Sequence, residues 1–337
     1  MIISRTPFRI SFFGGGTDYP AWYLQESGAV LSTTIDKYCY ISCRYLPPFF
    51  NIRHRIVWSH IETVMTIPEI LHPAVREGLR LLGFDDSVGL EIHYQGDLPA
   101  RAGMGSSSAF AVGLIKALTA LRGQMTTKHD LALKAIDLEQ RELREHVGSQ
   151  DQIAAAYGGF NVIHFLKGGE IRVEPVTISA SRLAELQSRL LLFYAGSTRL
   201  ASAVAAEVVS NLGRKREHLR KMRLMVDQAV TVLNNGADLD EFGRMLDETW
   251  KLKRDLSPAV SSPAVEDIYQ AAISHGALGG KLLGAGGTGF LVFYVPREKQ
   301  QHVKRALSAC LHVPFKFESE GSMVIYYAPN DAAAFVE

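Results

Sequence analysis

Residues 98–109 read Leu98-Pro-Ala-Arg-Ala-Gly103-Met-Gly-Ser-Ser-Ser-Ala109. Apolar and polar residues alternate over 88–95 just before this segment, which predicts a strand with one buried face. Apolar residues recur at helical spacing from Phe110 to Leu121, so the glycines and serines lie where a helix begins. A helix N-terminus offers unpaired N–H groups, and glycine lets an anion approach them closely. The segment therefore predicts a phosphate-binding loop, while a small-residue helix start that only packs against a strand is the alternative.

Two better-known nucleotide loops are excluded. The pattern G-x-x-x-x-G-K-[ST] does not occur in the chain, so a Walker-type kinase is not indicated. Residues Gly284-Ala-Gly-Gly-Thr-Gly289 satisfy G-x-G-x-x-G, but an apolar segment typical of a strand follows them. The dinucleotide-binding pattern must open a helix, so a Rossmann fold is not indicated either.

Composition limits the classes of function. The chain has 337 residues, of which 47% are hydrophobic, and this length predicts two domains. A formal net charge of +1 provides no general field for nucleic acid or anionic lipid, and the basic cluster at 214–223 has the spacing of a solvated helix face. Three cysteines match no zinc or disulfide pattern, and no apolar run approaches twenty residues. We therefore expect a cytoplasmic protein with neither nucleic acid nor membrane as a partner.

Periodicity along the chain predicts mixed α and β structure. A helix is expected over 129–144, with Thr127 as its cap, followed by two strands around a turn at 167–169. We place a domain boundary near residue 180, which gives domains at 1–180 and 181–337. The second half is expected to hold a strand at 190–194, helices at 201–211, 214–234, 238–253 and 264–275, two strands flanking 284–289, and a last strand at 323–327.

The N-terminal segment Arg5 to Pro20 combines a strand-like run, the glycines 14–16 and a carboxylate at Asp18. Glycine permits unusual backbone angles near a ligand, and a carboxylate accepts hydrogen bonds from sugar hydroxyls. Considered alone, Asp18 is equally typical of a turn.

These segments together resemble the GHMP kinases, the superfamily of galactokinase, homoserine kinase, mevalonate kinase and phosphomevalonate kinase. Residues 7–19 match the first motif, 98–109 the second and 281–290 the third, with Thr288 where a glycine is common. The motifs occur in the family order and span nearly the whole chain. The resemblance implies an α+β fold of two domains, the N-terminal one like ribosomal protein S5 domain 2 and the C-terminal one ferredoxin-like.

Within the superfamily, residues 5–20 and 147–159 most resemble the bacterial D-glycero-D-manno-heptose 7-phosphate kinases. That resemblance implies ATP- and Mg²⁺-dependent phosphorylation of the anomeric hydroxyl of a sugar phosphate, which feeds nucleotide-heptose synthesis for capsule or other surface polysaccharide. A kinase of a free sugar (L-fucose, galactose or a mannose-like sugar) and a non-catalytic sugar and ATP sensor are the alternatives. A homodimer is left open.

The resemblance also assigns roles to individual residues. Asp151 matches the catalytic aspartate and Arg9 the arginine beside it; their alternatives are a helix cap and an ordinary strand residue. Ser107 and Glu139 are the expected Mg²⁺ ligands, with Glu142 as second choice because we expect both glutamates on one helix face. The expected sugar-binding residues are Gly15, Gly16, Thr17 and Asp18. The expected nucleotide-binding residues are Gly103, Met104, Gly105, Ser106, Ser107, Ser108, Gly284, Ala285, Gly286 and Gly287. Candidates for the 7-phosphate, by charge alone, are Arg44, Arg53, His54 and Arg55.

Overall fold

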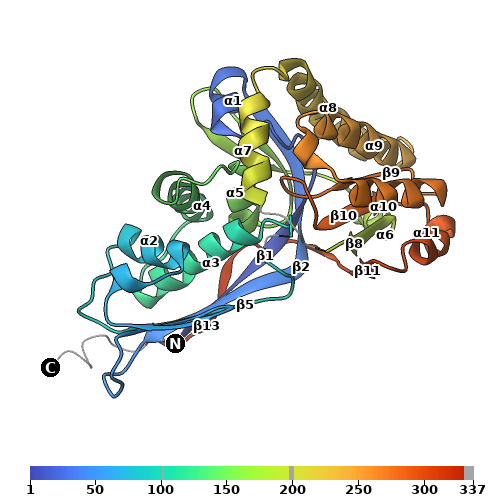
Figure 1. Ribbon diagram of the computed structural model, residues 1–337. Coiled ribbons are helices and arrows are strands. Elements are labelled where there is room, and N and C mark those ends of the chain that lie inside the picture. Colours follow the sequence, from blue (N-terminus) through green and yellow to red (C-terminus); the bar gives the residue numbers. More distant parts are fainter. Residues whose placement is uncertain (101, 197–200, 330–337) are drawn as a thin grey trace.

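The computed structural model describes residues 1–100, 102–196 and 201–329. Within these ranges nine strands form one sheet and four strands form a second, smaller sheet. Helices pack on both sheets, and Figure 1 shows the small sheet with its helices beside one end of the large one. The predicted α+β fold is confirmed.

The large sheet is organised around two long strands that pair with each other along most of their length, β1 (Ile2–Phe13) and β2 (Gly28–Tyr45). The order is β13 (Met323–Tyr327), β1, β2, β5 (Leu90–Gly96), β3 (His54–Val57) and β4 (Ile61–Val64). The first half of β2 also pairs with β6 (Phe160–Phe165), which pairs with β7 (Ile171–Pro175). Because β1 is buried along nearly its whole length, it fixes the position of Arg9 firmly.

Helices cover one face of the large sheet, and α3 (Ser106–Leu121) lies directly on β1 and β2 (Figure 1). It is buried on nearly all sides, as expected for a helix that is apolar all round. The other helices of this domain are α1 (Pro20–Glu26), α2 (Pro73–Leu81), α4 (Lys128–Asp137) and α5 (Gln150–Tyr157), with short helical turns η1 (Ile67–Glu69) and η2 (Leu138–Glu142).

The second domain is built on the antiparallel sheet β11-β8-β10-β9. Its strands are β8 (Leu190–Tyr194), β9 (Gly279–Leu282), β10 (Phe290–Tyr294) and β11 (Leu311–His312). Its helical elements are α6 (Ala180–Ser188), α7 (Ala201–Asn211), α8 (Arg216–Asn234), α9 (Asp240–Arg254), η3 (Pro258–Val260), α10 (Pro263–Ser274), η4 (Arg297–Lys299) and α11 (Gln300–Ala306). The strands β8, β9 and β10 and the helices α7 to α10 lie close to the predicted ranges, whereas α6 and β11 were not predicted.

The last strands depart from the simple division at residue 180. Strand β13 pairs with β1, and β12 (Phe317–Glu318) pairs with β2, so both belong to the large sheet. The Met1 amino group also donates to the Ala328 carbonyl. That the chain passes from the first domain to the second near residue 180 stays a prediction. Residues 317–327, however, return to the sheet of the first domain. Residues 330–337 of the predicted second domain lie outside the described residues.

The helix expected over 129–144 is shorter than predicted. Thr127 caps α4 as expected, with its side chain accepting from the Asp130 N–H, but α4 ends at Asp137 and continues as the π-helical turn η2. In a π turn the angular spacing differs from that of an α-helix, so Glu139 is buried while Glu142 is exposed. The expectation that both glutamates share one face was wrong.

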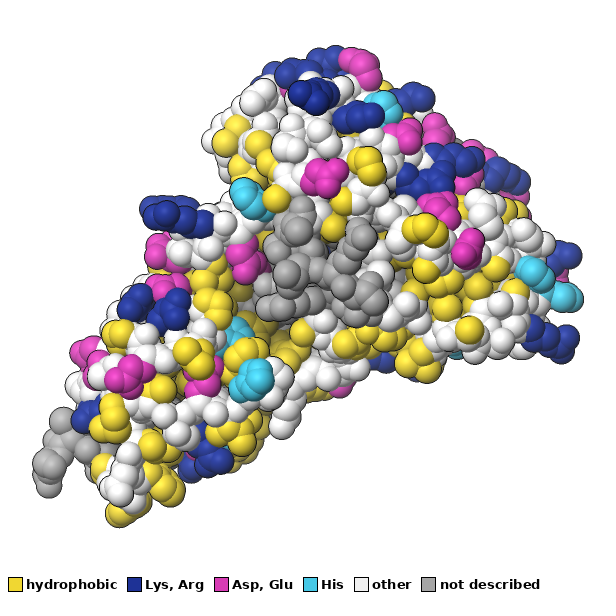
Figure 2. Space-filling view, viewed as in Figure 1, with side chains coloured by type: hydrophobic (Ala, Val, Ile, Leu, Met, Phe, Trp, Pro, Cys, Tyr) yellow, Lys and Arg dark blue, Asp and Glu magenta, His cyan; other side chains and the backbone are white. Residues whose placement is uncertain are grey.

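The basic cluster at 214–223 lies at the start of α8 and is ion-paired. Arg220 donates to Glu26 and Glu217, and Arg223 pairs with Asp227 at 2.8 Å. Figure 2 shows Lys and Arg side chains interspersed with Asp and Glu over this part of the surface. Within the described residues, no helix has the length and apolarity required to cross a membrane.

Candidate active site

Arg9 on β1 and Asp151 in the first turn of α5 form a bidentate ion pair. The Arg9 Nε donates to Asp151 Oδ1 at 2.7 Å and its Nη2 to Oδ2 at 2.6 Å. Its Nη1 donates to the Gly103 carbonyl at 2.9 Å. Charge-assisted hydrogen bonds in this parallel geometry fix both orientation and distance. Arg9 therefore ties the carboxylate of Asp151 to the glycine and serine loop.

The loop ends at Gly105, which has a left-handed backbone conformation and directly precedes α3. Gly105 is the N-cap of α3, with φ at 72°, and a methyl group there would lie 3.2 Å from Asp151 Oδ2. Ser106, Ser107 and Ser108 form the first turn, where backbone N–H groups lack helical partners. The arrangement presents helix N–H groups next to a carboxylate. Arg101 of the same motif lies outside the described residues.

Glu139 lies beneath this first turn and is bound to its serines. Ser107 Oγ donates to Glu139 Oε1 at 2.8 Å, Ser108 Oγ to Oε2 at 2.7 Å, and Gln152 Nε2 to Oε2 at 2.5 Å. Burial raises the pKa of Glu139 to about 7, against the lowering effect of these three donors. Ser107 and Glu139 thus place two oxygen donors together, as a hard cation requires. The described residues contain no group of three or more His, Cys, Asp or Glu suited to a metal.

A cavity of about 760 Å³ opens in front of these groups. Its lining includes residues from both domains. The predicted site residues in the lining are Arg9, Gly15, Gly16, Asp18, Gly103, Gly105, Ser106, Ser107, Ser108, Asp151, Gly284 and Ala285. Met104, Gly286, Gly287, Thr17 and Glu139 do not line it. The volume falls within the range of small-molecule sites.

One end of the cavity carries an aromatic wall, formed by Trp58, His60, His72, Tyr94 and Phe110. His72 stacks on Phe110 with ring centroids 4.8 Å apart, and Trp58 lies edge-on to His72 at 4.8 Å. The Trp58 Nε1 donates to Glu62 at 2.7 Å, which fixes the indole. The sequence analysis missed this wall, because its residues come from the β3–β4 turn, the N-cap of α2, β5 and α3, and no pattern within the sequence joins them.

The third motif packs against the second through glycine backbones. A methyl group on Gly284 would lie 2.5 Å from the Gly103 Cα, and one on Gly289 would lie 2.3 Å from the Ala102 carbonyl oxygen. Gly286 faces Val260 in the same way, and the Gly287 N–H donates to the Val260 carbonyl at 2.9 Å. Gly286 and Gly287 therefore shape the turn and do not line the cavity, and their part in nucleotide binding stays a prediction.

The first motif supplies the other side of the cavity. Asp18 is buried and accepts from the Gly16 N–H at 2.9 Å; burial and the nearby Asp151 charge raise its pKa. Thr17 has a different role from the one predicted. Its hydroxyl donates to the Gly14 and Ala29 carbonyls and accepts from the Ala29 N–H, so it is satisfied by backbone and does not face the cavity.

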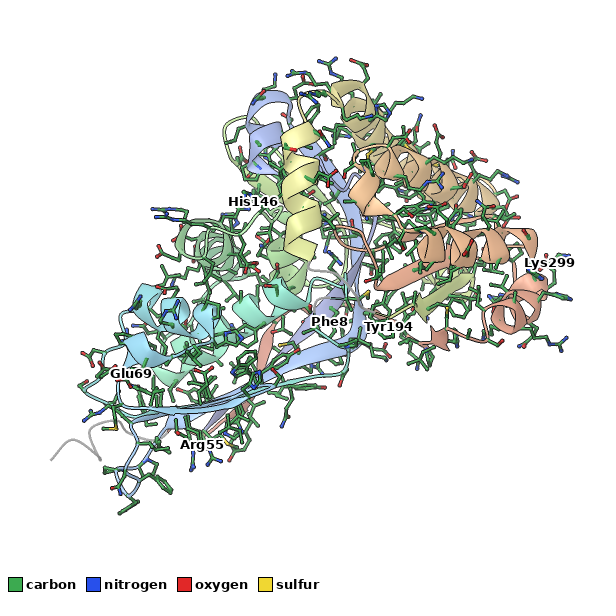
Figure 3. All side chains as sticks on the ribbon, in the orientation of Figure 1. Phe8, Arg55, Glu69, His146, Tyr194 and Lys299 are labelled. Carbon is green, nitrogen blue, oxygen red and sulfur yellow. The ribbon has the colours of Figure 1, made fainter. Side chains whose placement is uncertain are left out.

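The candidates for the 7-phosphate lie elsewhere. Arg44 and Arg55 pair with Glu91 on the sheet, at 2.6 and 3.5 Å, and Arg53 and His54 contact Asp86. None of the four lines the cavity. Figure 3 shows Arg55 near the far end of the large sheet, well separated from His146, which does line the cavity. The prediction from charge alone was therefore wrong: these side chains bind carboxylates and carbonyls of their own domain.

Comparison with known proteins places this site in a family. Residues 69–159 match the family model described as GHMP kinases N terminal domain, and residues 230–313 match GHMP kinases C terminal. The chain belongs to the GHMP kinase family. The two matched GHMP segments contain the serine turn and Asp151 in the first, and the third glycine motif in the second.

Individual GHMP kinases extend the comparison over nearly the whole chain. The D-glycero-alpha-D-manno-heptose 7-phosphate kinase of Campylobacter jejuni is 28% identical, covering 91% of this chain and 93% of its own length. The L-fucokinase/L-fucose-1-P guanylyltransferase of Bacteroides fragilis is 27% identical over all of this chain, which spans 37% of that longer protein. The crystal structure of a D-glycero-D-manno-heptose 1-phosphate kinase from Bacteroides thetaiotaomicron has a TM-score of 0.78 at 24% identity, covering 97% and 99% of the two chains. This GHMP kinase therefore transfers phosphate from ATP to an alcohol.

Proposed function

We propose that the protein phosphorylates the anomeric hydroxyl of D-glycero-D-manno-heptose 7-phosphate with ATP, giving the 1,7-bisphosphate for nucleotide-heptose and surface polysaccharide synthesis. The observation that carries the proposal is the Arg9–Asp151 pair beside the serine turn, in a chain similar to a heptose 7-phosphate kinase over 91% of its length. The cytoplasmic location and a homodimer stay predictions.

Phosphoryl transfer needs alignment, charge neutralisation and removal of one proton. In the proposed reaction the anomeric oxygen forms a bond to the γ-phosphorus of ATP while the bond from that phosphorus to the bridging oxygen breaks, and ADP leaves. Asp151 accepts the proton of the attacking hydroxyl, and Arg9 holds the carboxylate in place through two hydrogen bonds. Asp18 and the Gly15–Gly16 backbone line the same side of the cavity and orient the sugar.

The nucleotide is proposed to lie along the first turn of α3. Its phosphates accept from the N–H groups of Ser106 to Ser108, and its adenine ring packs on the wall of Trp58, His72 and Phe110. Ser107 and Glu139 would hold Mg²⁺ together with phosphate oxygens. When bound, Mg²⁺ neutralises charge on the transferred group.

A kinase of a free sugar is the second candidate. It is favoured by two observations: the fucokinase of Bacteroides fragilis is nearly as similar to this chain as the heptose kinase, and none of Arg44, Arg53, His54 and Arg55 lines the cavity. A non-catalytic sugar and ATP sensor is less consistent with the intact Arg9–Asp151 pair.

A substrate panel tests these proposals. Purified protein with ATP and Mg²⁺ is assayed for ADP release with heptose 7-phosphate, free heptose, L-fucose, galactose and mannose, with Asp151→Asn as control. Turnover highest with heptose 7-phosphate is the expected result. Turnover with free L-fucose or galactose alone would refute the substrate assignment, and no turnover with any sugar would support the sensor.

A further inference from the structure

Two buried lysines in the cavity wall have no role in the proposed mechanism. Lys253 lies in the last turn of α9 and Lys281 in β9; both line the cavity, with exposed fractions of 8% and 2%. Lysine is almost never buried to this extent without a partner for its charge. Their position therefore needs an explanation beyond the packing of the second domain.

Backbone carbonyls, and not carboxylates, hold the two ammonium groups. Lys253 Nζ donates to the Leu282 carbonyl at 2.8 Å and to the Gly284 carbonyl at 2.6 Å, and Lys281 Nζ donates to the Phe12 carbonyl at 3.0 Å. Among the ion pairs of the described residues, none joins either lysine to a carboxylate. An ammonium group has three donors, so each lysine retains donating capacity toward the cavity.

The charges around the lysines do not balance. The groups that face them are Arg9 on β1, Asp18 after β1 and Asp151 on α5, and the lysines also face each other. Arg9 and Asp151 neutralise one another in their ion pair, which leaves two lysines against Asp18 alone. Burial first, and then the Arg9 charge, lower the pKa of Lys253 to about 7; burial and Lys253 lower that of Lys281 well below its ordinary value.

The location of the lysines indicates which ligand would complete this set. Lys253 binds the carbonyl of Gly284, whose backbone lies against Gly103 of the nucleotide loop. Lys281 binds the end of β1, two residues before the glycines that lead to Asp18. The two lysines thus lie between the proposed nucleotide and sugar regions. An anionic group at the junction of these two regions would lie next to both ammonium groups.

We propose that Lys253 and Lys281 form a binding site for a phosphoryl group in the wall made by α9 and β9. The inference rests on the proposed kinase function and adds two binding residues to it. The phosphoryl group comes either from the γ position of ATP or from the sugar phosphate. Both are dianionic, and both would accept hydrogen bonds from the two ammonium groups.

Direct binding measurements distinguish the two sources. Lys253→Met and Lys281→Met are compared with wild type and with Lys251→Met, which changes an exposed lysine of the same helix that pairs with Asp247. Affinities are measured by calorimetry for adenylyl imidodiphosphate and ADP, and for heptose 7-phosphate and free heptose. Loss of one charge-assisted interaction should weaken binding roughly tenfold to a hundredfold. If the methionine variants bind adenylyl imidodiphosphate more weakly but bind ADP as wild type does, the site holds the γ-phosphoryl group. If they bind heptose 7-phosphate more weakly but bind free heptose as wild type does, the site holds the sugar phosphate. Lys251→Met should have the affinities of wild type.

Proton uptake on ligand binding gives a second, independent test. An anion at the site should restore protons to the lysines, so wild-type protein at pH 8 should take up protons when the phosphoryl ligand binds, as measured in buffers of different ionisation enthalpy. Uptake that persists in Lys251→Met and is lost in folded Lys253→Met supports the site. Unchanged phosphate preference in both folded methionine variants, or no uptake by wild type with either ligand, overturns it. These experiments measure binding and do not require turnover. If no sugar in the substrate panel were phosphorylated, the proposed reaction would be refuted, but the binding site at the two lysines would still be tested independently.

Discussion

Replacing Asp151 by asparagine removes one negative charge from the centre of the cavity with almost no change in side-chain shape. The asparagine keeps one acceptor oxygen for Arg9 but turns an NH₂ group toward the guanidinium, so one of the two bonds at 2.6 and 2.7 Å is lost. The proposed proton acceptor is lost as well. General-base catalysis typically contributes about 10²- to 10⁴-fold, so kcat should fall by that amount while KM for ATP changes little.

The same substitution has a calculable effect on stability. The Asp151 side chain is 22% exposed and that of Arg9 is 4% exposed, so the pair is only partly screened by solvent. Losing one partner of a charged hydrogen bond costs about 1–3 kcal/mol, and we expect a lowered Tm with a cooperative transition. ADP release and thermal unfolding are measured on the same preparation.

Asp137→Asn is the matched control for Asp151→Asn. Asp137 accepts from Arg141 at 2.8 Å one helical turn away, and Arg141 is 78% exposed, so this surface pair should change stability by less than about 1 kcal/mol and leave kcat unaltered. If Asp151→Asn retains kcat within threefold of wild type while Asp137→Asn does the same, Asp151 is not the proton acceptor, and the reasoning from its position is refuted.

Three further substitutions test neighbouring parts of the site. Gly284→Ala adds a methyl group 2.5 Å from Gly103 at a φ of 70°, so KM for ATP should rise at least tenfold, whereas Gly168→Ala, with open space around it, should leave KM unchanged. Burial raises the pKa of Glu139 from 4.5 to about 7, so between these pH values the folded protein holds a proton that the unfolded chain releases. Without Mg²⁺, the free energy of unfolding should therefore fall as the pH rises from 4.5 to 7, and Glu139→Gln should flatten this slope. A Glu139→Gln variant with the same slope as wild type contradicts this assignment. Thr17→Val removes three backbone hydrogen bonds and should lower Tm without changing the KM for sugar; a raised KM with unchanged Tm would return Thr17 to the sugar site.

Much of the fold could be predicted because its signals are local. The alternation over 88–95, the apolar spacing after Ser108 and the glycines at 284–289 each specify an element from adjacent residues. The nearness of Asp151 to the serine turn was expected only through the family resemblance. It depends on Arg9, a residue far away in sequence, which binds both Asp151 and the Gly103 carbonyl.

The parts that were missed depend on long-range contacts or on a local change of helix type. Lys253 occupies the last turn of a helix, where lysine is common for its interaction with the dipole, so nothing in the sequence marks it as buried. Lys281 carried a weak signal, because it is a charged residue between Gly280 and Leu282 in a short strand. The separation of Glu139 from Glu142 depends on the π turn, which helical spacing does not reveal.

The return of residues 317–327 to the first sheet has a consequence for biosynthesis. Strand β13 is the lateral neighbour of β1 and pairs Ile2 with Tyr327, so it is synthesised long after β1. Until it arrives, one side of β1 exposes unpaired N–H and C=O groups, which favour intermolecular strand pairing. Pairing across so long a stretch of chain is also slow. The nascent protein should therefore be prone to intermolecular pairing until β13 has been synthesised, even though its phosphate loop and Asp151 are made well before that strand.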